Sequence, residues 1–104
     1  MKLTDRIIDY NTNKTRFKVY GLYNSEELII PKYIGVTFRD PIERLSQHIH
    51  HAEGTPVINW IRTTNYNIVM RVLQYTETRE EMYQIERKFI REYPKLLNTS
   101  KHYK

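Results

Sequence analysis

The sequence contains no cysteine, a single alanine and only 3 glycines among its 104 residues. Without cysteine there are no disulfide bonds and no thiolate metal sites, which suits a reducing compartment. The longest aliphatic run, Leu28-Ile29-Ile30, is too short to span a bilayer, and no signal-peptide core follows Met1. So few glycines also argue against a glycine-rich loop that cradles nucleotide phosphates. We therefore expect a cytoplasmic domain with no membrane partner.

Positive charge and tyrosine are what the chain has in excess. Lys and Arg number 17 against 12 Asp and Glu, which gives a net charge of +5 at pH 7, and there are 9 tyrosines. Basic surfaces attract polyanions, and tyrosine rings stack on bases while their hydroxyls contact phosphates. Nucleic acid is therefore the leading class of partner. Codon usage in an AT-rich genome is the alternative explanation of the tyrosine excess.

The length fits one domain. Residues 17–98 are expected to form it, preceded by an N-terminal arm or short helix over 1–16 and followed by a basic tail over 99–104. The order of strand-like and helix-like segments predicts an α/β domain with a small, largely antiparallel three-stranded sheet flanked by helices. Strands are expected over 17–23, 28–37 and 66–75, the first two as a hairpin, and helices are expected to start at Asp40-Pro41, Thr55-Pro56 and Thr78.

Three side chains on the expected helices suit phosphodiester chemistry. Arg44 offers a planar guanidinium fork for a phosphate, and His48 lies one turn further on the same helix face. Such pairs are most often part of a solvated face. Glu86 borders the apolar face of the later helix, where a carboxylate is costly unless it is paired or ligates a metal. A border ion pair with Arg or Lys is the structural alternative, and a hard oxygen ligand for Mg²⁺ or Mn²⁺ is the functional one.

The ordered set of Tyr20, Tyr33-Ile34-Gly35, Arg44, His48 and Glu86 resembles the GIY-YIG endonuclease family over residues 17–98. The resemblance implies a small nuclease domain that cuts DNA with one divalent metal, Mg²⁺ or Mn²⁺. It also implies that Tyr20 and Tyr33 activate or orient the attacking water with help from His48. Arg44 would stabilise the pentacoordinate phosphate, and Glu86 would hold the metal beside the leaving 3′-oxygen.

The tyrosine of the first motif has two candidates, because Gly21-Leu22-Tyr23 reproduces the motif's letters while Tyr20 is the other choice. Side chains alternate across a strand. If the pairs Phe17/Val19 and Ile34/Val36 face the main core, Tyr20 and Tyr33 emerge together on the opposite face, where Arg44 and Glu86 would converge. Leu22 shares that face with Tyr20, which counts against this choice. We still favour Tyr20, because the strand continues past it through Leu22 to the turn at Asn24.

Two other classes of function compete with a nuclease. The first is a non-catalytic nucleic-acid-binding protein on the same scaffold, which would be expected to lose the equivalents of Arg44 or Glu86, yet both are present. The second is a basic assembly protein with no nucleic-acid role. For a nuclease without a separate DNA-reading domain, a homodimer or an accessory protein is a candidate source of substrate selection.

Overall fold

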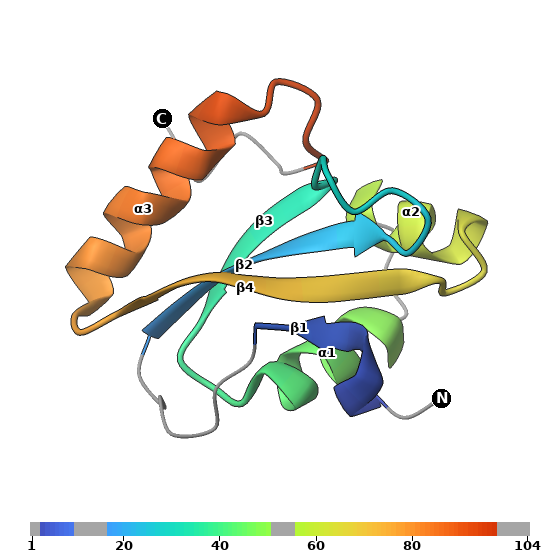
Figure 1. Cartoon of the computed structure of the whole chain (residues 1–104), viewed down its shortest axis with the longest axis horizontal. Coiled ribbons are helices and arrows are strands. Elements are labelled where there is room, and N and C mark those ends of the chain that lie inside the picture. The colour runs from blue at the N-terminus through green and yellow to red at the C-terminus, as the bar shows by residue number, and fades with distance from the viewer. Residues whose placement is uncertain (1–2, 10–16, 51–55, 98–104) are drawn as a thin grey trace.

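The computed structural model describes residues 3–9, 17–50 and 56–97. The arm expected over 1–16 lies largely outside the described residues, and the tail expected over 99–104 lies wholly outside them. Of the pair Thr55-Pro56, expected to start the second helix, only Pro56 is described. None of the described helices has the length and apolar character that a bilayer crossing requires. The elements in chain order are η1 (Leu3–Arg6), β1 (Ile7–Ile8), β2 (Phe17–Asn24), β3 (Tyr33–Thr37), α1 (Pro41–His50), α2 (Pro56–Thr63), β4 (Ile68–Thr76) and α3 (Arg79–Glu92), as Figure 1 shows.

The sheet has four strands in the order β1-β4-β2-β3, not the three expected. β2 is antiparallel to both β3 and β4, which confirms the largely antiparallel α/β fold. The fourth strand is the two-residue β1, which pairs with β4 in parallel. A segment of two residues is too short to show the alternation of side chains that predicts a strand. Whether it forms a strand depends on pairing with a distant segment, in this case β4.

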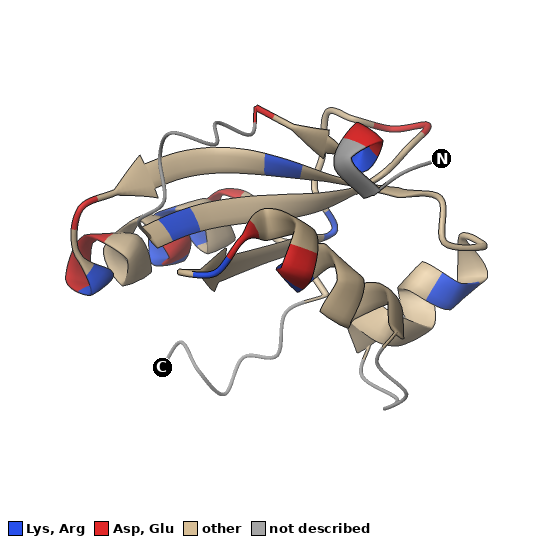
Figure 2. Cartoon of the chain, turned by 90° about the horizontal axis from the view of Figure 1, so that it is seen from below, with Lys and Arg blue, Asp and Glu red and all other residues tan. Residues whose placement is uncertain are grey.

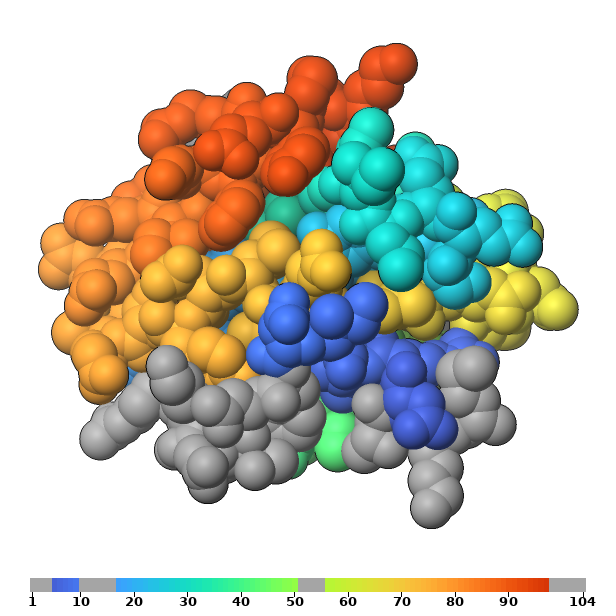
Figure 3. Space-filling view, in the orientation of Figure 1, coloured from blue at the N-terminus to red at the C-terminus, as the bar shows by residue number. Residues whose placement is uncertain are grey.

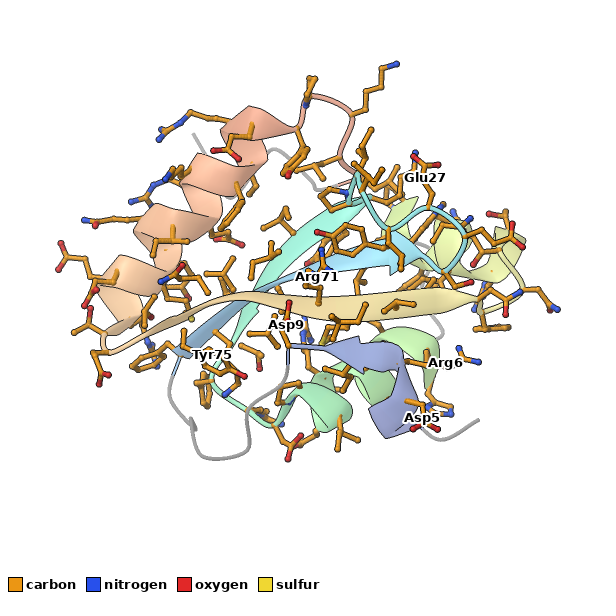
Figure 4. All side chains as sticks on the ribbon, viewed as in Figure 1. Asp5, Arg6, Asp9, Glu27, Arg71 and Tyr75 are labelled. Carbon is orange, nitrogen blue, oxygen red and sulfur yellow. The ribbon has the colours of Figure 1, made fainter. Side chains whose placement is uncertain are left out.

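Contacts beyond the pairing also attach the segment around β1 to β4. Asp9 follows β1, and its Oδ2 lies 3.4 Å from Nε of Arg71 on β4. Tyr75 donates a hydrogen bond of 3.3 Å from its hydroxyl to the Asp9 carbonyl oxygen. Figure 4 shows Asp9 and Arg71 directed toward one another from the two strands. At the other end of β4, Arg6 donates to the carbonyl oxygen of Tyr66.

Apolar side chains pack on both faces of the sheet. The larger cluster lies on the face covered by α1 and α2 and consists of Tyr20, Leu22, Leu45, Val57, Ile58, Ile61, Ile68 and Met70. The second lies under α3 and consists of Val19, Ile34 and Met82, with Phe17, Val36, Leu73 and Phe89 among the half-buried residues around it. In Figure 3 the side chains of α3, β4 and the segment between β2 and β3 cover the near face, and little of α1 is visible.

The condition that Phe17, Val19, Ile34 and Val36 face the main core is not met. They share the α3 face with the smaller cluster, whereas Tyr20 lies in the larger one. The alternation itself holds, because the Phe17/Val19 set and Tyr20 lie on opposite faces of β2. A bulge between Val19 and Tyr20 in the pairing of β2 with β4 adds one residue on the β4 side at this point.

Local sequence signals account for the starts of α1 and α3. Asp40 accepts a hydrogen bond of 2.9 Å on Oδ1 from the backbone N–H of Ile42. Thr78 caps α3 by accepting from the backbone N–H of Glu81 at 3.1 Å. The strand expected over 28–37 is shorter in the structure. It corresponds to β3, which begins only at Tyr33, and residues 28–30 are exposed and lie outside any strand.

Candidate active site

Tyr20 lies at the middle of β2, and its ring extends over the neighbouring strand. Its partner in the β2–β3 ladder is Gly35. A Cβ added at Gly35 would lie 2.5 Å from Cζ of Tyr20 and 2.8 Å from Cε2 of Tyr33, closer than real Cβ contacts come. The missing side chain therefore makes room for the Tyr20 ring above β3. Since β3 is the last strand in the sheet order, the hydroxyl is carried toward that open edge.

Helix α1 supplies the groups that contact this hydroxyl. Arg44 and His48 are four residues apart, so they lie on the same side of the helix. Oη of Tyr20 lies 2.7 Å from Nε2 of His48 and accepts a hydrogen bond of 3.1 Å from Nε of Arg44. His48 is buried and Arg44 is half-buried, so neither belongs to a freely solvated helix face.

Tyr33, the first residue of β3, completes an aromatic cluster around the same point. Its ring centroid lies 6.3 Å from that of Tyr20 and 5.3 Å from that of His48, with the His48 ring edge-on. These spacings fall within the range of favourable aromatic pairs. Interactions with Arg44 and Tyr20 also reach the Tyr33 hydroxyl. Tyr20 therefore interacts with each of the other three predicted residues, Tyr33, Arg44 and His48.

Glu86 comes from α3, the helix on the opposite face of the sheet. Its exposed fraction is 3%, and with Met82 it belongs to the buried side of α3. Its charge nevertheless raises the pKa values of both Tyr20 and Tyr33, so the carboxylate interacts electrostatically with both phenol groups. The sequence predicts that Arg44 and Glu86 converge on one face of the sheet. In the structure Arg44 and His48 come from α1 on one face, and Glu86 comes from α3 on the other.

Burial keeps the tyrosine hydroxyls protonated. Desolvation is the largest cause that raises the pKa of Tyr20, and Tyr33 and Glu86 raise it further, against an opposing effect of Arg44. Desolvation is also the main cause that raises the pKa of Tyr33. Neither tyrosine is therefore a ready-made phenolate at neutral pH. On the same strand, burial lowers the pKa of Lys18, partly offset by the charge of Asp40.

Tyr23, the rival candidate for the first motif, lies elsewhere. It is 3% exposed, and its ring is 5.9 Å from the guanidinium carbon of Arg71. Burial and, secondly, the charge of Tyr93 raise its pKa. Its ring therefore lies against Arg71 of β4 rather than against α1. The structure brings Tyr20, and not Tyr23, against Arg44 and His48.

The sequence did not single out Gln47. Its Oε1 accepts a hydrogen bond of 3.0 Å from Nη1 of Arg44, the arm of the fork that does not contact Tyr20. Arg44 is thereby held at two nitrogens in one orientation. The signal was available, because a glutamine three residues after an arginine on a helix lies within reach of it.

The oxygen donors at this site suit a hard divalent cation that takes few of its ligands from the protein. Among the residues that the structure describes, no three or more His, Asp or Glu side chains gather into a site that could enclose a metal. Mg²⁺ commonly binds to one or two carboxylates and completes its shell with water and substrate phosphate oxygens. A single buried carboxylate, that of Glu86, beside two tyrosine hydroxyls is compatible with that mode of binding.

Comparison with families of known proteins gives a match over most of the chain. Residues 16–101 match the family model of the GIY-YIG catalytic domain. No curated protein and no solved structure gives a significant match. The members of this family are generally endonucleases, and the match spans the strands and helices that carry all five site residues. The chain belongs to the GIY-YIG family of nuclease domains.

Proposed function

We propose that this protein is a metal-dependent DNA endonuclease that hydrolyses phosphodiester bonds at the cluster of Tyr20, Tyr33, Arg44, His48 and Glu86. The observation that carries the proposal is the hydroxyl of Tyr20, held between Nε2 of His48 at 2.7 Å and Nε of Arg44 at 3.1 Å. A hydroxyl with a base on one side and a cation on the other can move a proton without ionising itself.

The hydrogen-bond pattern supports a proton relay. Arg44 only donates, so the Tyr20 oxygen accepts from it, and the Tyr20 proton can point toward Nε2 of His48 in the tautomer that leaves this nitrogen unprotonated. As a water attacks phosphorus, its proton passes to Tyr20 Oη while the Tyr20 proton passes to His48. Tyr20 stays neutral throughout, consistent with its raised pKa. Tyr33, in ring contact with both, orients the water.

Arg44 has the role of binding the phosphate. Its guanidinium can donate to two oxygens of a phosphate in one plane. In the free protein one nitrogen is bonded to Tyr20 and another to Gln47, which fixes the plane before substrate arrives. A preoriented donor costs no reorganisation when negative charge develops on the phosphoryl oxygens.

Glu86 is the residue that would hold the divalent ion, Mg²⁺ or Mn²⁺. When bound there, the ion supplies charge neutralisation for the leaving 3′-oxygen. The burial of Glu86 keeps its carboxylate in one place and away from competing solvent.

DNA as the substrate agrees with the charge of the chain. The net charge is +5, and Figure 2 shows Lys and Arg spread over strands and helices rather than confined to one element. A distributed positive charge attracts a DNA backbone without selecting a sequence. Selection of the substrate would then come from a homodimer, an accessory protein or the surface near the site. A protein that only binds nucleic acid is disfavoured, because it has no need of the Tyr20–His48 contact or of a buried Glu86.

The test is cleavage of supercoiled plasmid by purified protein with Mg²⁺ or with EDTA, for the wild type and for Glu86→Gln. We expect nicking or linearisation only with wild type and metal. Glu86→Gln should bind DNA as the wild type does, measured in EDTA, without cutting it. Glu92→Gln, which removes an exposed carboxylate from the same helix, is the matched control and should cut normally. Cleavage by Glu86→Gln, or unfolding of that variant by circular dichroism, would contradict the metal-ligand role.

A further inference from the structure

An exposed aromatic ring lies next to the site, in the loop between β3 and α1. Phe38 is 56% exposed, which is unusual for a phenylalanine. The guanidinium carbons of Arg39 and Arg79 lie 6.0 Å and 5.8 Å from its ring centroid. Arg79 is the first residue of α3, so this contact joins the β3–α1 loop to the helix that carries Glu86. Two guanidinium groups from separate parts of the chain therefore lie within about 6 Å of one exposed aromatic ring.

A hollow of about 350 Å³ adjoins this ring, and Arg44 forms part of its wall. Phe38 and Arg39 line it from the loop, Gln47 from α1, and Tyr83 from α3. Its volume is at the low end of the range for ligand pockets, roughly 300–1,000 Å³. The hollow thus has room for one small planar group but not for a double helix, and it shares Arg44 with the candidate active site.

We propose that this hollow binds one unpaired nucleotide of the DNA, next to the phosphate held by Arg44, with its base stacked on Phe38. The proposal rests on the proposed function and adds to it the class of substrate. Substrates with a single-stranded or unpaired nucleotide at the cut would be bound in preference to fully paired duplex.

The chemistry of the lining favours a nucleotide over other occupants. Every base has a flat face that stacks on an aromatic ring, and this stacking tolerates any sequence. Arg39 and Arg79 provide positive charge for the flanking phosphates. Arg39 is also paired with Glu43 at 3.2 Å, but both side chains are about half exposed, and such surface pairs contribute little. A phosphate can therefore replace Glu43 as the partner of Arg39.

The same lining explains why the nucleotide would be unpaired. In a duplex both faces of each base are already stacked on their neighbours, so no face is free for Phe38 until the base leaves the stack. An unpaired base avoids that unstacking cost. The hollow would consequently bind an unpaired base, whose face is exposed, and would hold the adjoining phosphate against Arg44.

The experiment measures binding in EDTA, so that it does not depend on cleavage. A fluorescein-labelled 12-nucleotide single strand and a blunt duplex of the same sequence are titrated with wild type, Phe38→Leu, Phe38→Trp and Tyr66→Leu, and anisotropy is recorded. Leucine keeps an apolar side chain at an exposed position but removes the flat ring. Tyr66, also exposed, lies before β4 at the end of that strand far from α3, and is the matched control.

We expect Phe38→Leu to weaken binding to the single strand by about 5- to 150-fold, the loss of one base–aromatic stack, while duplex binding stays unchanged. Phe38→Trp should retain single-strand binding, and Tyr66→Leu should match the wild type on both DNAs. Equal affinity of Phe38→Leu and wild type for the single strand, or equal weakening on both DNAs, would overturn the proposal. Phe38-dependent binding without cleavage in Mg²⁺ would instead count against the proposed function alone.

Discussion

Gly35 lies opposite Tyr20 in the β2–β3 ladder, and the space where its side chain would be is filled by the ring of Tyr20. Gly21 has a similar relation to Tyr23, since a Cβ there would lie 2.9 Å from Cε1 of Tyr23. Each of these glycines therefore accommodates one of the two tyrosines that compete for the first motif. Only the first pair lies at the candidate active site.

Substitution of the two glycines should separate activity from packing. Gly35→Ala pushes on Tyr20 and Tyr33, so we expect cleavage to fall by about 10²-fold, the usual effect of displacing a reacting group by about 1 Å. Gly21→Ala pushes on Tyr23 and should keep its cleavage rate. Both variants should lose about 1–3 kcal/mol of unfolding free energy through overpacking. Plasmid nicking rates and urea denaturation give the two measurements, and equal loss of activity in both variants would contradict the assignment.

Removal of the hydroxyl groups gives a more direct comparison. Tyr20→Phe deletes the atom bonded to His48 and Arg44, so we expect a loss of cleavage of at least about 10²-fold, as for other acid–base groups. The unfolding free energy should fall by about 1–3 kcal/mol, because buried polar partners lose their bond. Tyr23→Phe should cut DNA as the wild type does. An inactive Tyr23→Phe beside an active Tyr20→Phe would transfer the role to Tyr23.

Arg44 should affect turnover more than affinity. Its fork is expected to donate mainly to charge that develops on the phosphoryl oxygens, so Arg44→Lys and Arg44→Ala should lower the cleavage rate by about 10²–10³-fold. DNA affinity in EDTA should change far less. Lys88→Ala removes an exposed positive charge from α3 and serves as the control. If affinity and rate fell in the same proportion, Arg44 would be an ordinary phosphate contact.

Binding by the wild type should also weaken steeply with salt. Each neutralised phosphate contributes about 0.9 to the slope of log K against log salt concentration on duplex DNA. Titrations between low and physiological ionic strength measure that slope. A flat dependence would argue against DNA as the partner of this basic chain.

Alkaline pH should destabilise the fold through Tyr20. Its folded pKa is raised above the unfolded value of about 10, chiefly by burial, so unfolding above that pH releases a proton. The unfolding free energy is therefore highest below about pH 10 and falls by about 1.4 kcal/mol per pH unit for each such tyrosine above it. Tyr33 and Tyr23 shift in the same direction. Urea unfolding from pH 9 to 11 should give a shallower decline for Tyr20→Phe, and an unchanged slope would contradict the assigned burial.

The parts of the fold that follow from neighbouring residues could be predicted from the sequence. The starts of α1 and α3 lie in short capping patterns around Asp40 and Thr78, and both caps form. The apolar run at residues 28–30 led to a wrong prediction of a strand, since these residues are exposed and lie outside any strand. A composition typical of strands does not show whether the segment pairs with a neighbouring strand. β1 escaped prediction for the converse reason, since its pairing with β4 depends on a distant partner.

The sequence predicted candidate members of the site but not their arrangement. The continuation of the strand past Tyr20 favoured Tyr20 over Tyr23, and in the structure Oη of Tyr20 lies beside Nε2 of His48. That Glu86 approaches from the opposite face depends on which side of the sheet each helix covers, a property of the whole topology. The burial of His48 was equally hidden, because helix spacing gives the face of a side chain and not what covers it.

The order of the elements along the chain has a consequence for when activity can arise. Tyr20, Tyr33, Arg44 and His48 all lie in β2, β3 and α1, whereas Glu86 lies in α3, the last of the described helices. A nascent chain that has left the ribosome only as far as α1 would carry the relay residues but not the carboxylate. If Glu86 holds the metal, such a nascent chain is inert toward DNA, and the capacity to cut appears only when α3 docks against the sheet. Activity then reports on completed folding.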